Sequence, residues 1–518
     1  MFRMHKRFIA LCTGILLFHA AFGQDEGDAL RYSYLFPGGT ARMQAIGGTG
    51  VSLGGDPGYM FMNPAGIGMF RTNDFSITSG FRSQTANSSY LQDESSDNKA
   101  NLYIQQLGLV FASNKKRGSN SRWQNITFGL GLNRLANFNS NVYIRGVNDQ
   151  SSYSEKYLEQ LRDDRVTDPN DAASNYPYGA SLAFNTYLID TTMDAFGNIT
   201  GYQSYVPLKP GILQENSISS RGGLNEFALS VAGNYDNKFY IGLALGVPSI
   251  KYRRVNTYSE SRTEGNNNNG FQDFTLTENL NTDGVGINGK IGMIYAINSM
   301  IRIGAAFHSP TVYSMHDTYV SRMTTNTGNF NGSNSQSSLD LNDGYPGDYD
   351  YSLTTPWRAM GGLSVIFGTS PDVSAQHGFL SLDYEYVNYA AARFHFNGSN
   401  STADDKAYAN SLNRSISSMY KGASNVRLGG ELKFNILAVR AGFAWIGSPY
   451  ADSDIKGQQM RYSGGLGIRT HGIYADLSYI YSSRQDAYYP YLLEDKPVSP
   501  ADLTYHSSNV VLTFGFEF

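Results

Sequence analysis

From Asp74 to the C-terminus the chain repeats one pattern, segments of roughly ten residues in which apolar and polar side chains alternate. A period of two is typical of β-strands whose two faces meet different surroundings. We expect about fourteen such strands, an even number, as in bacterial membrane barrels. The expected ranges are 74–86, 101–113, 123–136, 225–235, 238–253, 271–296, 300–316, 348–367, 377–390, 424–434, 437–446, 459–469, 472–482 and 507–518.

The connections between these segments alternate between long and short. The longer ones are 87–100, 137–224, 254–270, 317–347, 391–423, 447–458 and 483–506, and the shorter ones are 114–122, 236–237, 297–299, 368–376, 435–436 and 470–471. Outer-membrane barrels have short periplasmic turns and long external loops, whereas a soluble β-sandwich has no reason to keep this parity. The sequence therefore predicts an all-β transmembrane antiparallel barrel with both termini in the periplasm.

In such a barrel the apolar face of each strand points to lipid and the polar face into the lumen. Residues 437–445, for example, place Leu437, Val439, Phe443 and Trp445 on one face and Arg440 on the other. Charged side chains would be costly in lipid, so we expect a set of them to face the lumen. That set is Arg302, His308, Arg358, Asp383, Glu385, Arg427, Glu431, Arg440 and Asp476, with Lys433 beside them. We favour interior ion pairs that hold strands and an internal plug over a role in selectivity.

The stretch from Gly38 to Phe70 is rich in glycine and apolar residues but has neither a helical nor a strand period. Irregular backbone carries N–H and C=O groups that must find partners, so a segment this apolar needs shelter. We expect residues 24–73 to form a plug, or hatch, inside the barrel of residues 74–518. Asn63, Pro64, Ala65 and Gly66 would form its fixed corner, because proline holds Asn63 extended and Asn63 can bond nearby backbone.

Residues 1–23 have the features of a secretory signal peptide, with Arg3, Lys6 and Arg7 before an apolar core and small residues at the cleavage site. The single cysteine, Cys12, lies in this segment, and Leu11 before it argues against lipidation. Loss of the three cations changes the formal charge from -4 to -7, which argues against nucleic-acid binding.

The composition suits a barrel and not a helical membrane bundle. Glycine (55), tyrosine (37) and phenylalanine (29) are abundant, charged residues make up 16%, and the mean hydropathy is -0.35. The last strand ends with Phe514, Phe516 and Phe518 on one face. A terminal phenylalanine after alternating aromatic residues resembles the signal read by the outer-membrane assembly machinery, which we therefore expect as a partner.

The longest connection, 137–224, contains an apolar helix face at Tyr157, Leu158 and Leu161 and a second apolar piece from Tyr176 to Leu188. Two interpretations are about equally favoured, a cap folded on itself and a hydrophobic groove that captures ligand.

No pattern in the sequence predicts an enzyme, a cofactor or a metal site. The histidines have no metal-ligand spacing, and Gly48-Thr49-Gly50 lacks the strand and lysine of a phosphate loop. The segment from Asp340 to Gly344 resembles a calcium loop, but its glycine comes one place too early, so we expect an external turn with loop calcium as an alternative.

Four features together resemble the FadL/TodX family of outer-membrane transporters for hydrophobic compounds. They are the glycine-rich start that ends in Asn63-Pro64-Ala65-Gly66, the segment from Gly304 to Pro310, the strand entry from Thr355 to Arg358, and the terminal Phe518. The resemblance implies a barrel of fourteen strands, an N-terminal hatch, long-chain fatty acids or similar apolar substrates, capture by external loops, hatch movement and lateral exit through the wall. It assigns Asn63, Pro64 and Ala65 to the hatch motif.

Met60, Phe61, Met62, Met69 and Phe70 are candidates for the apolar lining of a ligand site, with plain packing of the plug as the alternative. The resemblance leaves two other functions open, because similar barrels look like partners or shuttles in type IX protein secretion or haemin-type receptors. We expect a monomeric, passive transporter in the outer membrane of a Gram-negative cell, in contact with lipid, lipopolysaccharide and a hydrophobic small-molecule ligand.

Overall fold

The computed structural model describes residues 25–263, 270–368, 377–396 and 402–518. The expected signal peptide and part of the expected connection 368–376 lie outside these residues. No helix among the described residues is long and apolar enough to cross a membrane.

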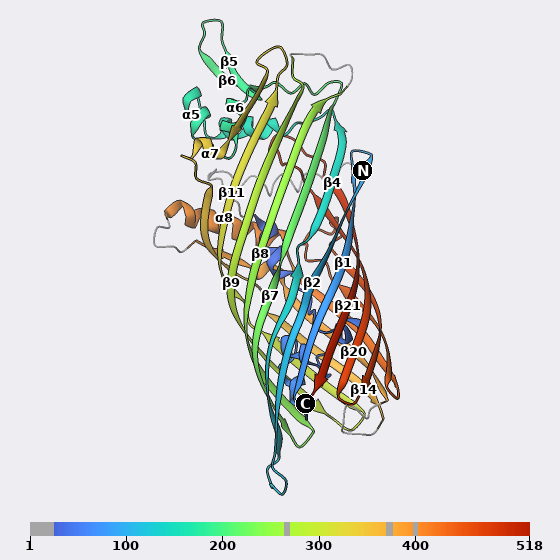
Figure 1. Cartoon of the computed structure of the whole chain (residues 1–518). Helices are drawn as coiled ribbons and strands as arrows, with labels where there is room; N and C mark the ends of the chain where they lie inside the picture. Colours follow the sequence, from blue (N-terminus) through green and yellow to red (C-terminus); the bar gives the residue numbers. More distant parts are fainter. Residues whose placement is uncertain (1–24, 264–269, 369–376, 397–401) are drawn as a thin grey trace.

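Fourteen strands of the described chain close into one antiparallel barrel, which confirms the expected fold (Figure 1). Each strand pairs with its neighbours along the chain, and the last strand pairs with the first from Asp74↔Glu517 to Ser89↔Asp502. The strands are β1 (Asp74–Tyr90), β2 (Asp93–Asn114), β3 (Trp123–Asn137), β7 (Ile212–Tyr235), β8 (Phe239–Arg262), β9 (Asp273–Ala296), β10 (Ile301–His308), β14 (Arg358–Phe367), β15 (Gly378–Asn388), β17 (Gly422–Phe434), β18 (Leu437–Ile446), β19 (Gln459–Thr470), β20 (Ile473–Tyr488) and β21 (Ala501–Glu517).

Five further strands in the same sheet extend or join the wall at the end with the long connections. They are β4 (Ser140–Asn148), β11 (Val312–Asn326), β12 (Ser333–Ser337), β13 (Gly347–Thr354) and β16 (Arg393–His395). β4 follows β3 and pairs with β7, while β11 follows β10 and pairs with β9 and β13.

Two segments expected as single strands, 300–316 and 348–367, are each broken at a proline. Pro310 separates β10 from β11, and Pro356 separates β13 from β14. The breaks lie side by side, since Thr355 N donates to Thr311 O at 2.9 Å. Proline has no N–H to give to a ladder, so both strands restart beyond it.

Apolar side chains cover the outside of the wall. Leu380, Leu428, Leu432 and Phe514 are each about half exposed, as are many equivalents on other strands. This is the exterior of a barrel that lies in lipid. At the end with the short turns, Asn73 and Phe518 exchange two backbone hydrogen bonds. Phe514, Phe516 and Phe518 all point outward.

The chain before β1 lies inside the barrel, where Figure 1 shows it in blue. It forms the helices α2 (Glu26–Ser33) and α3 (Ala41–Ala45) and the 3₁₀ helices η1 (Pro57–Phe61) and η2 (Pro64–Met69). Each begins at a side-chain cap, from Asp25, Thr40, Asp56 and Asn63 respectively. These caps satisfy N–H groups that an irregular, buried segment would leave without partners. The first described residues lie near the long connections, because Tyr420 donates to Glu26 O at 3.0 Å.

Smaller elements occupy the long connections. They are α4 (Ser154–Asp163), α5 (Pro169–Ser174), α6 (Ala180–Asn185), β5 (Ile189–Met193), β6 (Ile199–Ser204), α7 (Ser338–Leu341), η4 (Tyr389–Ala391) and α8 (Ala403–Met419). The connection 137–224 buries Tyr157, Leu161, Leu182 and Leu188 in one core together with residues of β8, β9, β11 and the connection before β21. The structure therefore supports a packed cap, the first of the two interpretations, but this cap packs on the wall and on a second loop as well as on itself.

Candidate functional site: the plug and the chamber above it

The plug, residues 37–70, fits against glycines on the inner face of the wall. A Cβ atom added to Gly442 would lie 2.0 Å from Gly47 N, and one added to Gly429 would lie 2.1 Å from Ile46 O. Gly304, Gly242 and Gly292 meet Val51, Pro64 and Asn63 as closely. Any larger side chain at these positions would occupy the volume of the plug backbone. The lower barrel is thus filled by packed protein.

Acidic groups from the wall hold the plug at two places. Asp383 on β15 accepts hydrogen bonds from Gly50 N at 2.6 Å and Val51 N at 3.0 Å. Glu431 on β17 pairs with Arg42 of α3 at 3.0 Å. Glu431 also receives Arg440 at 2.5 Å, and Arg440 reaches Asp476 at 2.6 Å. The buried charges of Arg42, Glu431, Arg440 and Asp476 are paired, whereas Asp383 is held by backbone N–H groups through one carboxylate oxygen.

The remaining expected lumenal residues also face the plug or one another. Glu385 pairs with Arg358 at 2.9 Å and with the fully buried Arg427. His308 Nε2 lies 2.7 Å from Met62 O, and Arg302 Nη1 lies 3.5 Å from Met69 Sδ. Seven of the nine are buried, and His308 and Arg358 are half-buried; their functional role stays a prediction.

Asn63 is fully buried at the turn into η2. Its Nδ2 donates to Val51 O at 2.6 Å and to Met293 O at 3.2 Å, and its Oδ1 accepts from Ala65 N at 3.1 Å. One side chain thus joins two parts of the plug to strand β9. Within the motif of residues 63–66, Asn63 therefore has a structural role through its hydrogen bonds. A role in gating stays a prediction.

The five candidate lining residues pack within the plug and against the wall. Met60, Phe61 and Phe70 share a cluster with Val110 and Ala228, Met62 packs with Met43 and Met360, and Met69 packs with Tyr240 and Ile294. Phe61 and Met62 border a small cavity of about 50 Å³. The structure supports packing for this set, and ligand contact stays a prediction.

Above the plug lies a chamber of about 520 Å³. Residues from β1, β2, β3, β4, β7, β8, β19, β20 and β21 form its sides, and α2 with Tyr34 and Phe36 forms part of its floor. Six arginines line it, which are Arg31, Arg82, Arg134, Arg254, Arg461 and Arg484. The sequence did not single them out. Arg31 lies on α2 and the other five lie on inward positions of five different strands, so only the tertiary structure reveals that they share a cavity.

Beside the chamber, the backbone ladder between β2 and β3 is interrupted, and side-chain hydrogen bonds such as Lys99 to Asn141 bridge the interruption. The β2–β3 ladder runs from Asn114↔Asn125 to Gln106↔Asn133 and ends there, while β4 pairs only with β7. From Asp93 to Gln105, β2 therefore pairs with β1 alone. At the break, Asn137 Nδ2 and Asn101 Oδ1 are 3.4 Å apart. Leu102 and Ile104 point outward, and Leu102 is 78% exposed.

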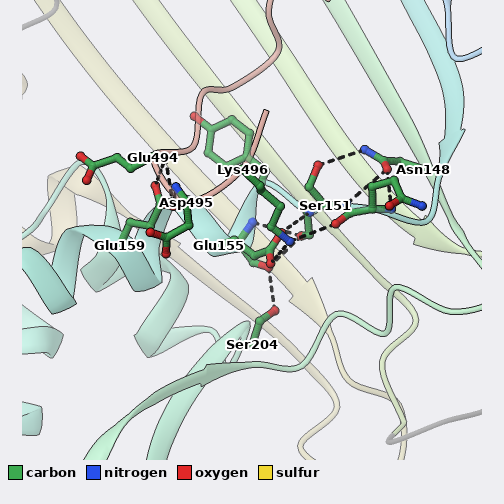
Figure 2. Close-up of polar contacts among 12 residues, drawn as sticks. Asn148, Ser151, Glu155, Glu159, Ser204, Glu494, Asp495 and Lys496 are labelled. Atoms are coloured by element: carbon green, nitrogen blue, oxygen red, sulfur yellow. Dashed lines mark hydrogen bonds and ion pairs between the residues drawn. The ribbon is translucent and has the colours of Figure 1, made fainter. Parts of the chain in front are cut away.

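Figure 2 shows how the cap is tied to the connection before β21. Glu159 on α4 accepts hydrogen bonds from Glu494 N and Asp495 N, the shortest at 2.9 Å, and Lys496 pairs with Glu155 at 2.7 Å. Deeper in the cap, Glu260 is fully buried and accepts from Tyr153 N, Gln214 and Tyr258. These contacts hold two distant loops as one unit.

No cluster of three or more potential metal-ligating side chains occurs among the described residues. In the calcium-like segment, Asp340 caps α7 by accepting from Ser337 N at 3.0 Å. This carboxylate already has a structural function.

Comparison with solved structures identifies the fold. A FadL homologue from Pseudomonas aeruginosa aligns with a TM-score of 0.54 over 93% of this chain and 99% of that one, at 12% identity. The chain has the FadL/TodX fold. The toluene transporter TodX of P. putida aligns with a TM-score of 0.51 over the same shares, also at 12% identity. No protein-family model and no curated protein matches the sequence. The FadL/TodX fold is thus recognised by comparing three-dimensional structures, because the sequence identity is low.

Proposed function

We propose that this protein is a passive outer-membrane channel for hydrophobic small molecules, which enter from the outside and leave sideways through the wall. The observation that carries the proposal is the position of the ladder break beside the chamber, directly above a filled lower barrel. A molecule in the chamber has no straight path down. In this proposal the way out of the chamber is lateral.

The depth of the break suits an exit into lipid. The continuous β2–β3 ladder has nine residue pairs. At about 3.4 Å per residue and a tilt of about 40°, these span roughly 23 Å of membrane depth, close to the height of the apolar band of a barrel. The outward Leu102 and Ile104 give the break an apolar outer rim. An apolar compound would gain free energy by passing from this rim to the hydrocarbon.

Hatch movement, in this proposal, is confined to α2 and residues 34–36, which precede the plug. Residues from Gly47 to Pro64 meet wall glycines at close range and stay in place. Leu30, Tyr34 and Phe36 line the chamber instead, so α2 and the chain after it can shift without opening the lower barrel. The toluene transporter TodX of P. putida has the same fold, which supports the same substrate class here.

A reversible cross-link tests the lateral exit. Asn101→Cys with Asn137→Cys places two thiols across the break, in a chain whose only natural cysteine lies in the expected signal peptide. Oxidation should stop uptake of radiolabelled oleate by proteoliposomes, and reduction should restore it.

The matched control is Gln485→Cys with Thr504→Cys, a pair within the intact β20–β21 ladder whose side chains do not line the chamber. Oxidation of the control should leave uptake unchanged. Full uptake through the cross-linked break would show that the exit lies elsewhere.

A further inference from the structure

The chamber has an unusual charge for a compartment on a route for apolar compounds. Six arginines line it, against two acidic residues, Asp25 and Asp486. Two of the arginines are neutralised locally, Arg484 by Asp486 at 3.3 Å and Arg31 by Asp28. Among the described residues, no carboxylate lies within ion-pair distance of Arg82, Arg134, Arg254 or Arg461.

Neutral groups hold two of these four guanidinium groups in place. Arg82 donates to Ser507 Oγ at 2.9 Å and to Asn137 O at 2.8 Å, and Arg134 donates to Asn225 Oδ1 at 3.2 Å. Such partners fix a side chain but leave its charge uncompensated. Both side chains therefore present a positioned positive charge to the chamber.

Two of the four arginines, Arg461 and Arg134, lie over aromatic rings. The guanidinium carbon of Arg461 lies 3.3 Å from the ring centre of Phe36, and that of Arg134 lies 5.4 Å from the ring centre of Tyr103. Arg254 Nε is buried without a hydrogen-bond partner among the described residues. Asp25 and Glu278 act on Arg254 only from beyond ion-pair distance. A guanidinium group stacked on a ring keeps its N–H fork free for an anion.

We propose, building on the transport function above, that the chamber binds amphipathic compounds that carry two or more negative charges. A neutral hydrocarbon would leave all four cations unpaired, and a single carboxylate would pair with at most two of them. A doubly charged head group, such as a phosphate monoester, offers enough acceptor oxygens for several guanidinium forks. The rings of Tyr34, Phe36, Phe138 and Tyr252 give the apolar body a surface, and the ladder break gives it a way to the lipid.

Three probes with one body and three heads test this. They are 1-pyrenebutanol, 1-pyrenebutanoate and the phosphate ester of 1-pyrenebutanol, titrated by fluorescence at pH 8 into the full protein in maltoside micelles. An unrelated barrel in the same micelles corrects for partition. Since a hydrogen bond to a charged group is worth about 10- to 100-fold in affinity, the phosphate should bind at least roughly 30-fold more tightly than the alcohol, with the carboxylate between them. Equal binding of all three would overturn the proposal.

Substitutions of single arginines and of pairs then test which residues bind the anionic head group. Arg82→Gln with Arg461→Gln should weaken phosphate binding by about 10-fold or more and change alcohol binding by less than about twofold. Arg461→Lys, which keeps the charge but loses the fork, should fall between. The matched control is Arg117→Gln, an exposed arginine in the short connection between β2 and β3. A loss shared by the control, or by the alcohol, would contradict a specific anion site.

Two further measurements separate the possible failures. Inorganic phosphate should displace the phosphate probe only at a roughly 100-fold higher concentration, because it lacks the apolar body; displacement at equal concentration would show a site for free anions instead. Uptake of the probes by proteoliposomes is measured independently. If affinity rises with head-group charge but no probe is taken up, the transport function is refuted and the anion-binding chamber is supported. If the probes are taken up but their affinities do not depend on charge, the anion-binding chamber is refuted and the transport function is supported.

Discussion

At the scale of single residues, glycines and carboxylates decide how the plug is held. Gly429 and Gly442 let plug backbone touch wall backbone, and Asp383 and Glu431 fix it by hydrogen bonds and an ion pair. Contact through backbone leaves no side chain that could move aside to release the plug. The fit is therefore sensitive to a single added methyl group.

Gly442→Val should displace the plug locally, because its Cβ would lie 2.0 Å from Gly47 N. We expect a loss of about 1–3 kcal/mol in the free energy of unfolding, as for other overpacked sites, and leak of small hydrophilic dyes from proteoliposomes. Urea unfolding and dye release measure the two effects. Gly361→Val is the control, since a Cβ atom there meets nothing within 4 Å. Equal behaviour of the two variants would contradict the close fit.

At the scale of elements, each strand is defined by its two faces. On β18, Val439 is 41% exposed on the outer face, whereas Arg440 on the inner face is 7% exposed and pairs with Glu431. A shift of register by one residue would exchange these faces and place charges in lipid.

Val439→Arg should therefore destabilise the barrel by roughly 2–4 kcal/mol if the site lies at mid-bilayer. Ile436→Arg, in the short turn before the same strand, should cost only about 0–1 kcal/mol because the turn lies at the membrane surface. Reversible unfolding in lipid vesicles compares the two. A cost for Val439→Arg no larger than for Ile436→Arg would refute the inside and outside assignment.

The cap depends on contacts between loops. Glu159 accepts backbone hydrogen bonds from Glu494 and Asp495, so Glu159→Ala leaves N–H groups without partners at a cost of about 1–3 kcal/mol. We expect faster protease cleavage within residues 489–500 while the barrel stays folded. Lys156→Ala, an exposed position on the same helix, should leave the cleavage rate unchanged. An unaltered rate in Glu159→Ala would show that the loop is held by other contacts.

At the scale of the whole molecule, a sealed lower barrel and a break beside an upper chamber define one route. Mass spectrometry of organic extracts, from protein purified in mild detergent, should find an amphipathic molecule enriched over an unrelated barrel. Retention follows from a chamber that combines rings with unpaired cations. An empty chamber with a bound secretion protein would instead favour the protein-secretion function.

The sequence by itself determined the wall. Alternation with a period of two places a strand and its faces without reference to any other strand, so positions such as Leu380, Asp383 and Val439 could be assigned from local pattern alone. The parity of the connections then predicted the architecture, but the expected long connection 87–100 was wrong, because β1 and β2 extend through it to a turn of two residues, Leu91 and Gln92. Pro310 and Pro356 are visible in the sequence, but the strand breaks at these residues were not predicted. The effect of a proline depends on which neighbouring strand needs the missing N–H.

Only the tertiary structure decided the chamber and its exit. Arg82, Arg134, Arg254 and Arg461 lie far apart in the chain, and the arrangement of their strands brings them to one cavity. The end of the β2–β3 ladder likewise depends on where two strands part, which neither strand encodes separately. The physical reason is that a strand's faces follow from its own alternation, whereas a cavity and a gap in a wall are relations between strands.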